Sequence, residues 1–122
     1  MSKVILTVDD SRTMRDMLSL ALIDAGFRVT QAVDGMHGLE VLRAAETPDV
    51  IVTDINMPKL DGFGFIEAVR RDARFRAIPI LVLTTESDAA KKSRARKAGA
   101  TGWIVKPFDA VKLVEAIRRV AA

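Results

Sequence analysis

The chain has 122 residues, a length that suits one domain, and 49% of them are hydrophobic, enough for a sizeable core. The lack of cysteine excludes a disulfide framework and a thiolate site, and the single histidine, His37, excludes a multi-histidine metal site. A net charge of +3 is too small to indicate nucleic-acid binding. No apolar run approaches the roughly 18 residues of a membrane span, and the first residues lack signal-peptide architecture, so we expect a cytoplasmic protein without membrane contacts.

The chain begins with a strand, a helix and a second strand. Residues 4–8 are apolar on both alternating faces, as in a strand that helices cover from both sides. Asp10 or Ser11 can cap the helix that follows, and Gly26 ends it. Residues 27–32 alternate more in polarity, which predicts a less buried second strand.

A second helix and a central strand come next. Asp34 can cap this helix, and we expect Gly35 and Gly38 to weaken its first turn because glycine disfavours helix. Residues 50–52 form a β-branched, fully apolar run that predicts a central strand. Asp54 follows this run, at the edge of the sheet where open α/β folds place their sites.

The second half of the chain repeats this alternation. Apolar side chains at helical spacing over residues 63–69 predict a third helix, and residues 78–84 predict a buried fourth strand. Ser87 or Asp88 can cap a fourth helix, which ends at Gly99. Its inner positions are mostly alanine, so we expect it to be the least stable helix.

Residues 102–106 predict a fifth strand, and Asp109 caps a last helix. Five strands alternating with five helices predict an α/β fold with a parallel, doubly wound (βα)5 sheet, because right-handed crossovers place helices on both faces. We expect one domain over residues 1–122, with no output domain because the chain stops at the fifth helix.

Polar residues follow four of the five predicted strands, at the same edge of the sheet. They are Asp9 and Asp10, Asp54, Thr84, and Lys106. Carboxylates about 4 Å apart repel by on the order of 4 kcal/mol per pair at an effective dielectric near 20, a cost that a hard divalent cation relieves. Oxygen ligands favour Mg²⁺ or Mn²⁺. The hydroxyl of Thr84 and the ammonium of Lys106 suit an anion bound beside the metal. This set predicts an aspartate that accepts a phosphoryl group.

The chain resembles the receiver domains of two-component response regulators, specifically the stand-alone CheY-like kind, over its whole length. The motifs that carry the resemblance are Val8-Asp9-Asp10-Ser11, Asp54-Ile55-Asn56-Met57-Pro58 followed by Asp61-Gly62, Leu83-Thr84-Thr85, and Lys106-Pro107-Phe108. Each motif is weak alone, but together and in order they are very specific. The resemblance implies a flavodoxin-like sheet with strand order 2-1-3-4-5.

The resemblance also implies roles for individual residues. Asp54 is the phosphoacceptor, and its donor is a phosphohistidine on a sensor histidine kinase. Asp10 and Asp54 ligate Mg²⁺ directly, Asp9 does so through water, and the backbone carbonyl of Asn56 supplies another ligand. Receivers hydrolyse the acyl phosphate themselves, and Asn56 and Glu86 occupy the two positions that set how fast this happens. We expect fast self-dephosphorylation and no other enzymatic activity.

A second set of implied residues concerns the phosphoryl group and the switch. Lys106 pairs with the phosphoryl oxygens, Thr84 hydrogen-bonds to one of them, and the Lys106-Pro107 bond is cis. Thr84 and Trp103 form the switch, although the family usually has Tyr or Phe where this chain has Trp103. By strand alternation Trp103 faces the fourth helix and Ile104 the last helix, and we expect the indole to become more buried on activation.

Several other features and functions were weighed. His37 is expected to be exposed and without a functional role. The fourth helix carries five cations, which are either a solvated face or a surface that binds a partner. These are Lys91, Lys92, Arg94, Arg96 and Lys97. A Mg²⁺-dependent aspartyl-nucleophile phosphatase lacks its Asp-x-Asp-x-Thr motif and lid here, and a flavodoxin-type nucleotide-binding module lacks its glycine-rich loop.

The expected output is binding of a downstream protein through the fourth helix, fifth strand and fifth helix. Chemotaxis, with a flagellar motor switch protein as target, is the favoured pathway, and a phosphorelay shuttle is the alternative. A separate phosphatase is a possible further partner. We expect a monomer that binds no nucleic acid.

Overall fold

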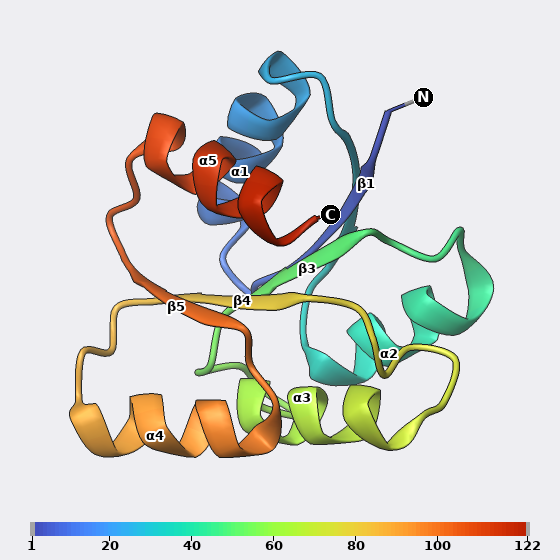
Figure 1. Ribbon diagram of the computed structural model, residues 1–122, viewed down its shortest axis with the longest axis vertical. Helices are drawn as coiled ribbons and strands as arrows, with labels where there is room; N and C mark the ends of the chain where they lie inside the picture. Colours follow the sequence, from blue (N-terminus) through green and yellow to red (C-terminus); the bar gives the residue numbers. More distant parts are fainter. Residues whose placement is uncertain (1, 122) are drawn as a thin grey trace.

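A computed structural model describes residues 2–121 and contains a parallel sheet in the order β2-β1-β3-β4-β5 (Figure 1). The strands are β1 (Val4–Val8), β2 (Arg28–Ala32), β3 (Val50–Thr53), β4 (Ile80–Thr84) and β5 (Gly102–Val105). The predicted α/β class and strand order are confirmed. The alternating apolar runs drive this arrangement, since the central strands β1, β3 and β4 are buried along their whole length.

Five helices cover the sheet, α1 and α5 on one face and α2, α3 and α4 on the other (Figure 1). They are α1 (Arg12–Asp24), α2 (Gly35–Ala44), α3 (Gly62–Arg71), α4 (Ala89–Ala98) and α5 (Ala110–Val120). The side chain of the residue before each helix accepts a hydrogen bond from a backbone N–H of its first turn, which satisfies one of the free donors there. The capping residues are Ser11, Asp34, Asp61, Asp88 and Asp109.

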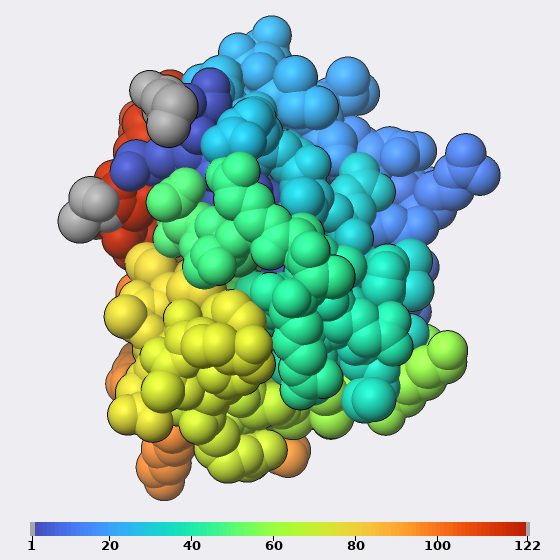
Figure 2. Space-filling view, turned by 90° about the vertical axis from the view of Figure 1, so that its right-hand side faces the viewer, coloured from blue at the N-terminus to red at the C-terminus, as the bar shows by residue number. Residues whose placement is uncertain are grey.

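The core has two halves, one on each face of the sheet, because neighbouring residues of a strand point to opposite faces. In β1, Ile5 joins the half under α1 and α5, whereas Leu6 joins the half under α2, α3 and α4. Phe65 is fully buried at the centre of the second half. Figure 2 shows the side of the molecule where α2 and residues 72–79, which connect α3 to β4, reach the surface.

The glycines of α2 permit close packing, a role that the sequence did not predict. A Cβ on Gly38 would lie 2.7 Å from a ring carbon of Phe65, and a Cβ on Gly35 would collide with the carbonyl oxygen of Leu60. The N–H of Gly35 donates to that same carbonyl at 3.1 Å. These two positions let α2 approach α3 and its preceding loop more closely than any side chain would permit.

Helix α4 has the small buried surface that its alanine content predicted. Of its ten residues, only Ala95 is buried. Gly99 ends the helix with φ of 120°, a left-handed conformation that glycine adopts without strain. Among residues 2–121, no helix combines the length and the apolar character that crossing a membrane requires.

Candidate functional site

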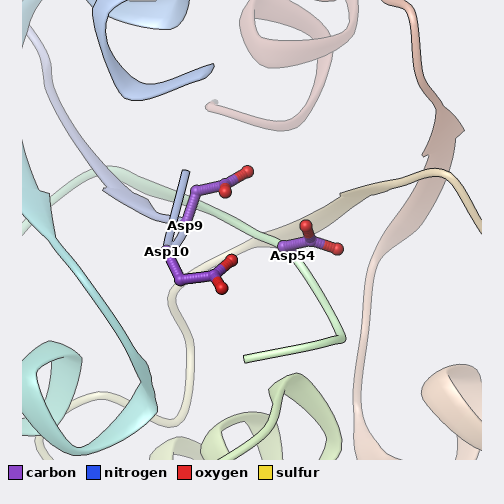
Figure 3. A group of neighbouring side chains, drawn as sticks. All are labelled: Asp9, Asp10 and Asp54. Carbon is purple, nitrogen blue, oxygen red and sulfur yellow. The ribbon is translucent and has the colours of Figure 1, made fainter. Parts of the chain in front are cut away.

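Three carboxylates meet at the carboxyl edge of the sheet (Figure 3). Asp9 and Asp10 directly follow β1, and Asp54 directly follows β3. These strands are paired, with Val8 opposite Thr53, so their ends lie together. Each of the three aspartates offers one oxygen, and these oxygens lie within 4.8 Å of one another. The structure therefore brings together the three acidic residues that the sequence singled out.

Backbone donors orient two of these carboxylates. The N–H of Ser11 donates to Asp9 Oδ1 at 2.9 Å, and the N–H of Ile55 donates to Asp54 Oδ1 at 2.6 Å. Arg15 Nη1 donates to the backbone oxygen of Asp9 at 2.8 Å, a contact that no sequence pattern predicted because it depends on how α1 leaves β1. Hydrogen bonds to a carboxylate favour its charged form and hold its oxygens in fixed directions.

Lys106 completes the cluster from the end of β5. Its Nζ lies 2.8 Å from Asp54 Oδ2 and 2.9 Å from Asp9 Oδ2. The lysine side chain is 10% exposed, so both ion pairs are largely shielded from solvent. The Lys106–Pro107 peptide bond is cis, the form that the resemblance implied. One ammonium thus bridges the two buried carboxylates of the cluster.

Burial and pairing act against each other in the pKa values of this cluster. Burial raises the pKa of Asp9 above its ordinary 3.8, even though hydrogen bonds from Lys106 and Ser11 favour the carboxylate. Burial by itself would lower the pKa of Lys106, but its hydrogen bonds to Asp54 and Asp9 outweigh this effect and raise it. Lys106 is therefore protonated at neutral pH.

The cluster fits a hard divalent cation. Its three carboxylates outnumber the single ammonium, which leaves two formal negative charges in excess. All the ligand atoms are oxygens, which Mg²⁺ and Mn²⁺ prefer. Asp10 is exposed and lies beside the two buried aspartates, so solvent can reach the metal-facing side of the cluster. Asn56 lies in the loop two residues beyond Asp54 and is exposed.

Comparison with known proteins identifies the family. The model of the response regulator receiver domain matches residues 5–118. The chain belongs to this family. It is 41% identical to chemotaxis protein CheY1 of Helicobacter pylori, over 91% of this chain and 90% of that protein. The structure of CheY4 from Vibrio cholerae is 43% identical with a TM-score of 0.92, and the match covers 98% of this chain and 99% of that one.

A further receiver structure bears on the metal. The receiver domain of sensor histidine kinase PA1611 from Pseudomonas aeruginosa is described with a magnesium ion coordinated in its active site cleft. It is 26% identical to this chain with a TM-score of 0.90, and the match covers 99% of this chain and 98% of that one. The chain is thus a CheY-type receiver of two-component signalling.

A hydrogen-bonded group in this receiver joins the loops around the acidic cluster. Glu86 Oε1 accepts from Asn56 Nδ2 at 3.1 Å and pairs with Lys91 Nζ at 3.0 Å. Hydrogen bonds from Asn56 and Lys91 lower the pKa of Glu86. The sequence had placed Asn56 and Glu86 beside the site and had left Lys91 open between a solvated face and a partner-binding surface. The structure shows that Lys91 belongs to this group.

Thr84 and Trp103 meet the same loop through its backbone. Thr84, fully buried at the end of β4, accepts a hydrogen bond from the N–H of Glu86 at 3.4 Å. The indole N–H of Trp103 donates to the carbonyl oxygen of Glu86 at 3.1 Å. Trp103 is half-buried and packs on the α4 side of the sheet, while Ile104 packs on the α5 side, as strand alternation predicted. The Glu86 residue therefore connects Thr84 to Trp103.

His37 is half-buried in this structure, whereas the sequence had placed it in an exposed position. Its Nδ1 accepts a hydrogen bond from the backbone N–H of Val33 at 3.0 Å, and its own N–H donates to the capping Asp34 at 2.8 Å. Because a side chain near a helix start can satisfy free backbone donors of the preceding loop, this histidine reinforces the start of α2.

Proposed function

We propose that this receiver accepts a phosphoryl group onto Asp54 from the phosphohistidine of a sensor histidine kinase. The observation that carries the proposal is the position of Asp54, buried beside two further carboxylates with Lys106 Nζ 2.8 Å from its Oδ2. A carboxylate in this position can act as a nucleophile, and the surrounding charges can stabilise a transferring phosphoryl group.

In the proposed transfer an oxygen of Asp54 bonds to phosphorus while the phosphorus–nitrogen bond of the donor breaks and its imidazole leaves. The attacking oxygen loses its charge on becoming the bridging oxygen of the acyl phosphate, so Lys106 is then available to the phosphoryl oxygens. Thr84 ends β4, the strand next to β3, and its hydroxyl would donate a hydrogen bond to a phosphoryl oxygen. Asp9, Asp10 and Asp54 would hold Mg²⁺, which supplies positive charge against the phosphoryl oxygens.

The proposed output surface is formed by α4, β5 and α5. A groove of about 370 Å³ lies along β5 and the start of α5. Its wall includes Trp103, Val105 and Phe108, and Val105 is 42% exposed. An apolar groove next to Trp103 suits a segment of a downstream protein, since a change at the indole would alter its shape. The chemotaxis relatives favour a target such as a flagellar motor switch protein, with the receiver acting as a cytoplasmic monomer and a phosphatase as a possible further partner.

Acetyl phosphate tests the proposal without the cognate kinase. Incubation with acetyl phosphate and Mg²⁺ should add one phosphoryl group to the intact protein, as measured by mass spectrometry, and a chelator should prevent it. Asp54→Asn should abolish the addition while the protein stays folded, because the amide is nearly isosteric and still accepts from Ile55. Asp61→Asn, at an exposed α3 cap that asparagine also fits, is the matched control. Labelling of the Asp54→Asn variant would disprove the assignment.

A further inference from the structure

The positive charge of the chain is concentrated in one segment. Residues 70–97 contain nine Lys or Arg and three Asp or Glu, a net charge of +6, although the whole chain carries only +3. This segment runs from the end of α3 to the end of α4, and the two helices are neighbours on one face of the sheet (Figure 1). The rest of the chain is therefore net negative.

A groove of about 430 Å³ lies between these two helices. Its walls carry four cations, two from each helix, and a single carboxylate, Glu67. The cations are Arg70, Arg71, Arg94 and Lys97. Glu67 reaches Arg71 only at 3.9 Å, in a pair that is exposed to solvent. Within residues 2–121, neither Arg94 nor Lys97 has a carboxylate within 4.0 Å, so their charges are not neutralised by the protein itself.

Two of the groove cations are held in place by the protein. Arg70 donates to the carbonyl oxygens of Gly99 at 2.9 Å and of Ile78 at 2.7 Å, which fixes its guanidinium between α3 and the end of α4. The guanidinium carbon of Arg94 lies 4.0 Å from the ring centroid of Phe63, a cation–π contact. Because these side chains are already ordered, a bound anion would lose less of its binding free energy to side-chain entropy.

We propose that the α3–α4 groove binds a carboxylate-rich peptide segment of a partner protein. The cations supply complementary charge, and the concave space between two helices accommodates an extended chain. The residues that line the groove include no aromatic side chain, and Phe63 under Arg94 is buried, so the groove offers no exposed ring on which a nucleic-acid base would stack. The surface is separate from the acidic cluster and from the groove along β5, and its binding does not depend on phosphorylation of Asp54.

A labelled peptide of alternating glutamate and serine is the probe, with alternating glutamine and serine as its neutral counterpart. Fluorescence anisotropy should show binding of the acidic peptide, weakened by salt, and none of the neutral one. The groove variant Arg94→Gln with Lys97→Gln should weaken binding by about tenfold. The variant Lys92→Gln with Arg96→Gln removes the same two residue types from the other flank of α4 and should change it by less than about twofold.

Arg71→Gln is a second groove variant that leaves the contact between Arg94 and Phe63 intact, and it should also weaken binding. The Asp54→Asn protein should bind the peptide normally, and the groove variants should be phosphorylated normally by acetyl phosphate, so this proposal and the phosphoacceptor assignment fail independently. Any of three results would overturn the inference. They are equal losses of peptide binding in the two α4 double variants, no binding of the acidic peptide, and equally tight binding of single-stranded DNA of the same charge.

Discussion

Lys106 is the residue on which the acidic cluster most directly depends. Its ammonium contacts the two buried carboxylates at 2.8 and 2.9 Å and so offsets part of their mutual repulsion before any metal binds. A buried carboxylate without such a partner would be costly. In the proposed phosphotransfer, this position would make Lys106 first the counter-ion of Asp54 and then that of the phosphoryl group. The environment of Asp9 shows that the compensation is incomplete.

Asp9 should make the stability of the metal-free protein depend on pH. Its pKa is raised above 3.8 by burial, so ionised Asp9 is less favourable in the folded than in the unfolded state. The contribution of Asp9 to the free energy of unfolding is therefore fully present below pH 3.8. It is lost as the pH rises through the raised pKa of the folded state. Asp9→Asn should unfold at higher urea concentration than the wild type at neutral pH, with a chelator present. This advantage should shrink below about pH 4, and a difference that is the same at every pH would contradict the prediction.

Asn56 and Glu86 should set the lifetime of the phosphoryl group. Both flank the cluster, and Asn56 is exposed, so water can approach Asp54 from this side. Asn56→Arg and Glu86→Lys should slow the loss of the phosphoryl group, because larger side chains obstruct that approach. The decay can be followed by mass spectrometry after acetyl phosphate is removed.

The control for this prediction is Lys91→Gln, which removes the ion pair with Glu86 without adding bulk beside Asp54. It should change the decay rate less than Asn56→Arg does. Unchanged decay in both bulky variants would show that these two positions do not control access of water.

Among the helices, α2 and α4 are stabilised in opposite ways. Helix α2 is packed so closely against α3 that a glycine is required at its interface with Phe65. Helix α4 buries only Ala95 and depends on local signals, with Asp88 as its cap and Gly99 at its end. Because few apolar contacts must be broken, α4 is the helix that can rearrange at the lowest cost.

Gly38→Ala should destabilise the protein although alanine favours helix. A Cβ at this position would lie 2.7 Å from Phe65, which cannot move within the core, and overpacking of this kind costs about 1–3 kcal/mol. Chemical denaturation measures the loss. Gly64→Ala is the control, since its Cβ would meet the end of the flexible, half-buried Leu60 side chain. An equal loss in both variants would mean that the α2–α3 contact is not the cause.

Two hydrogen bonds would connect the proposed phosphorylation site to Trp103. The N–H of Glu86 donates to Thr84 and its carbonyl accepts from Trp103, so one residue joins the end of β4 to β5. If Thr84 turns toward a phosphoryl oxygen, it gives up the Glu86 N–H, and the loop that anchors the indole becomes free to move. The weakly packed α4 beside Trp103 offers little resistance.

Beryllofluoride with Mg²⁺, which mimics the phosphoryl group, should change the fluorescence of Trp103. This is the only tryptophan in the sequence, so its emission reports the change without a label. Thr84→Ala should weaken the response, because the hydroxyl that links the phosphoryl group to Glu86 is missing, yet this variant should still be phosphorylated. Identical emission with and without beryllofluoride would make Trp103 a static packing residue.

The amino-acid sequence alone determined the order of the elements, some of their caps and the residues at the strand ends. These features depend on local rules. Apolar runs define strands, an aspartate such as Asp34 or Asp109 begins a helix, and parallel strands place Asp9 and Asp54 at one edge. The strand order came from the family resemblance, and the structure confirmed it.

Packing between distant parts of the chain decided the remainder. Whether Gly38 weakens α2 or permits its contact with Phe65 depends on a side chain 27 positions away. The ion pair of Lys91 was not predicted because its partner, Glu86, lies outside α4. The α3–α4 groove exists only once two helices are neighbours. Such contacts follow from the relative placement of packed elements, which no local pattern encodes, whereas strands and caps are set by nearest neighbours in the chain.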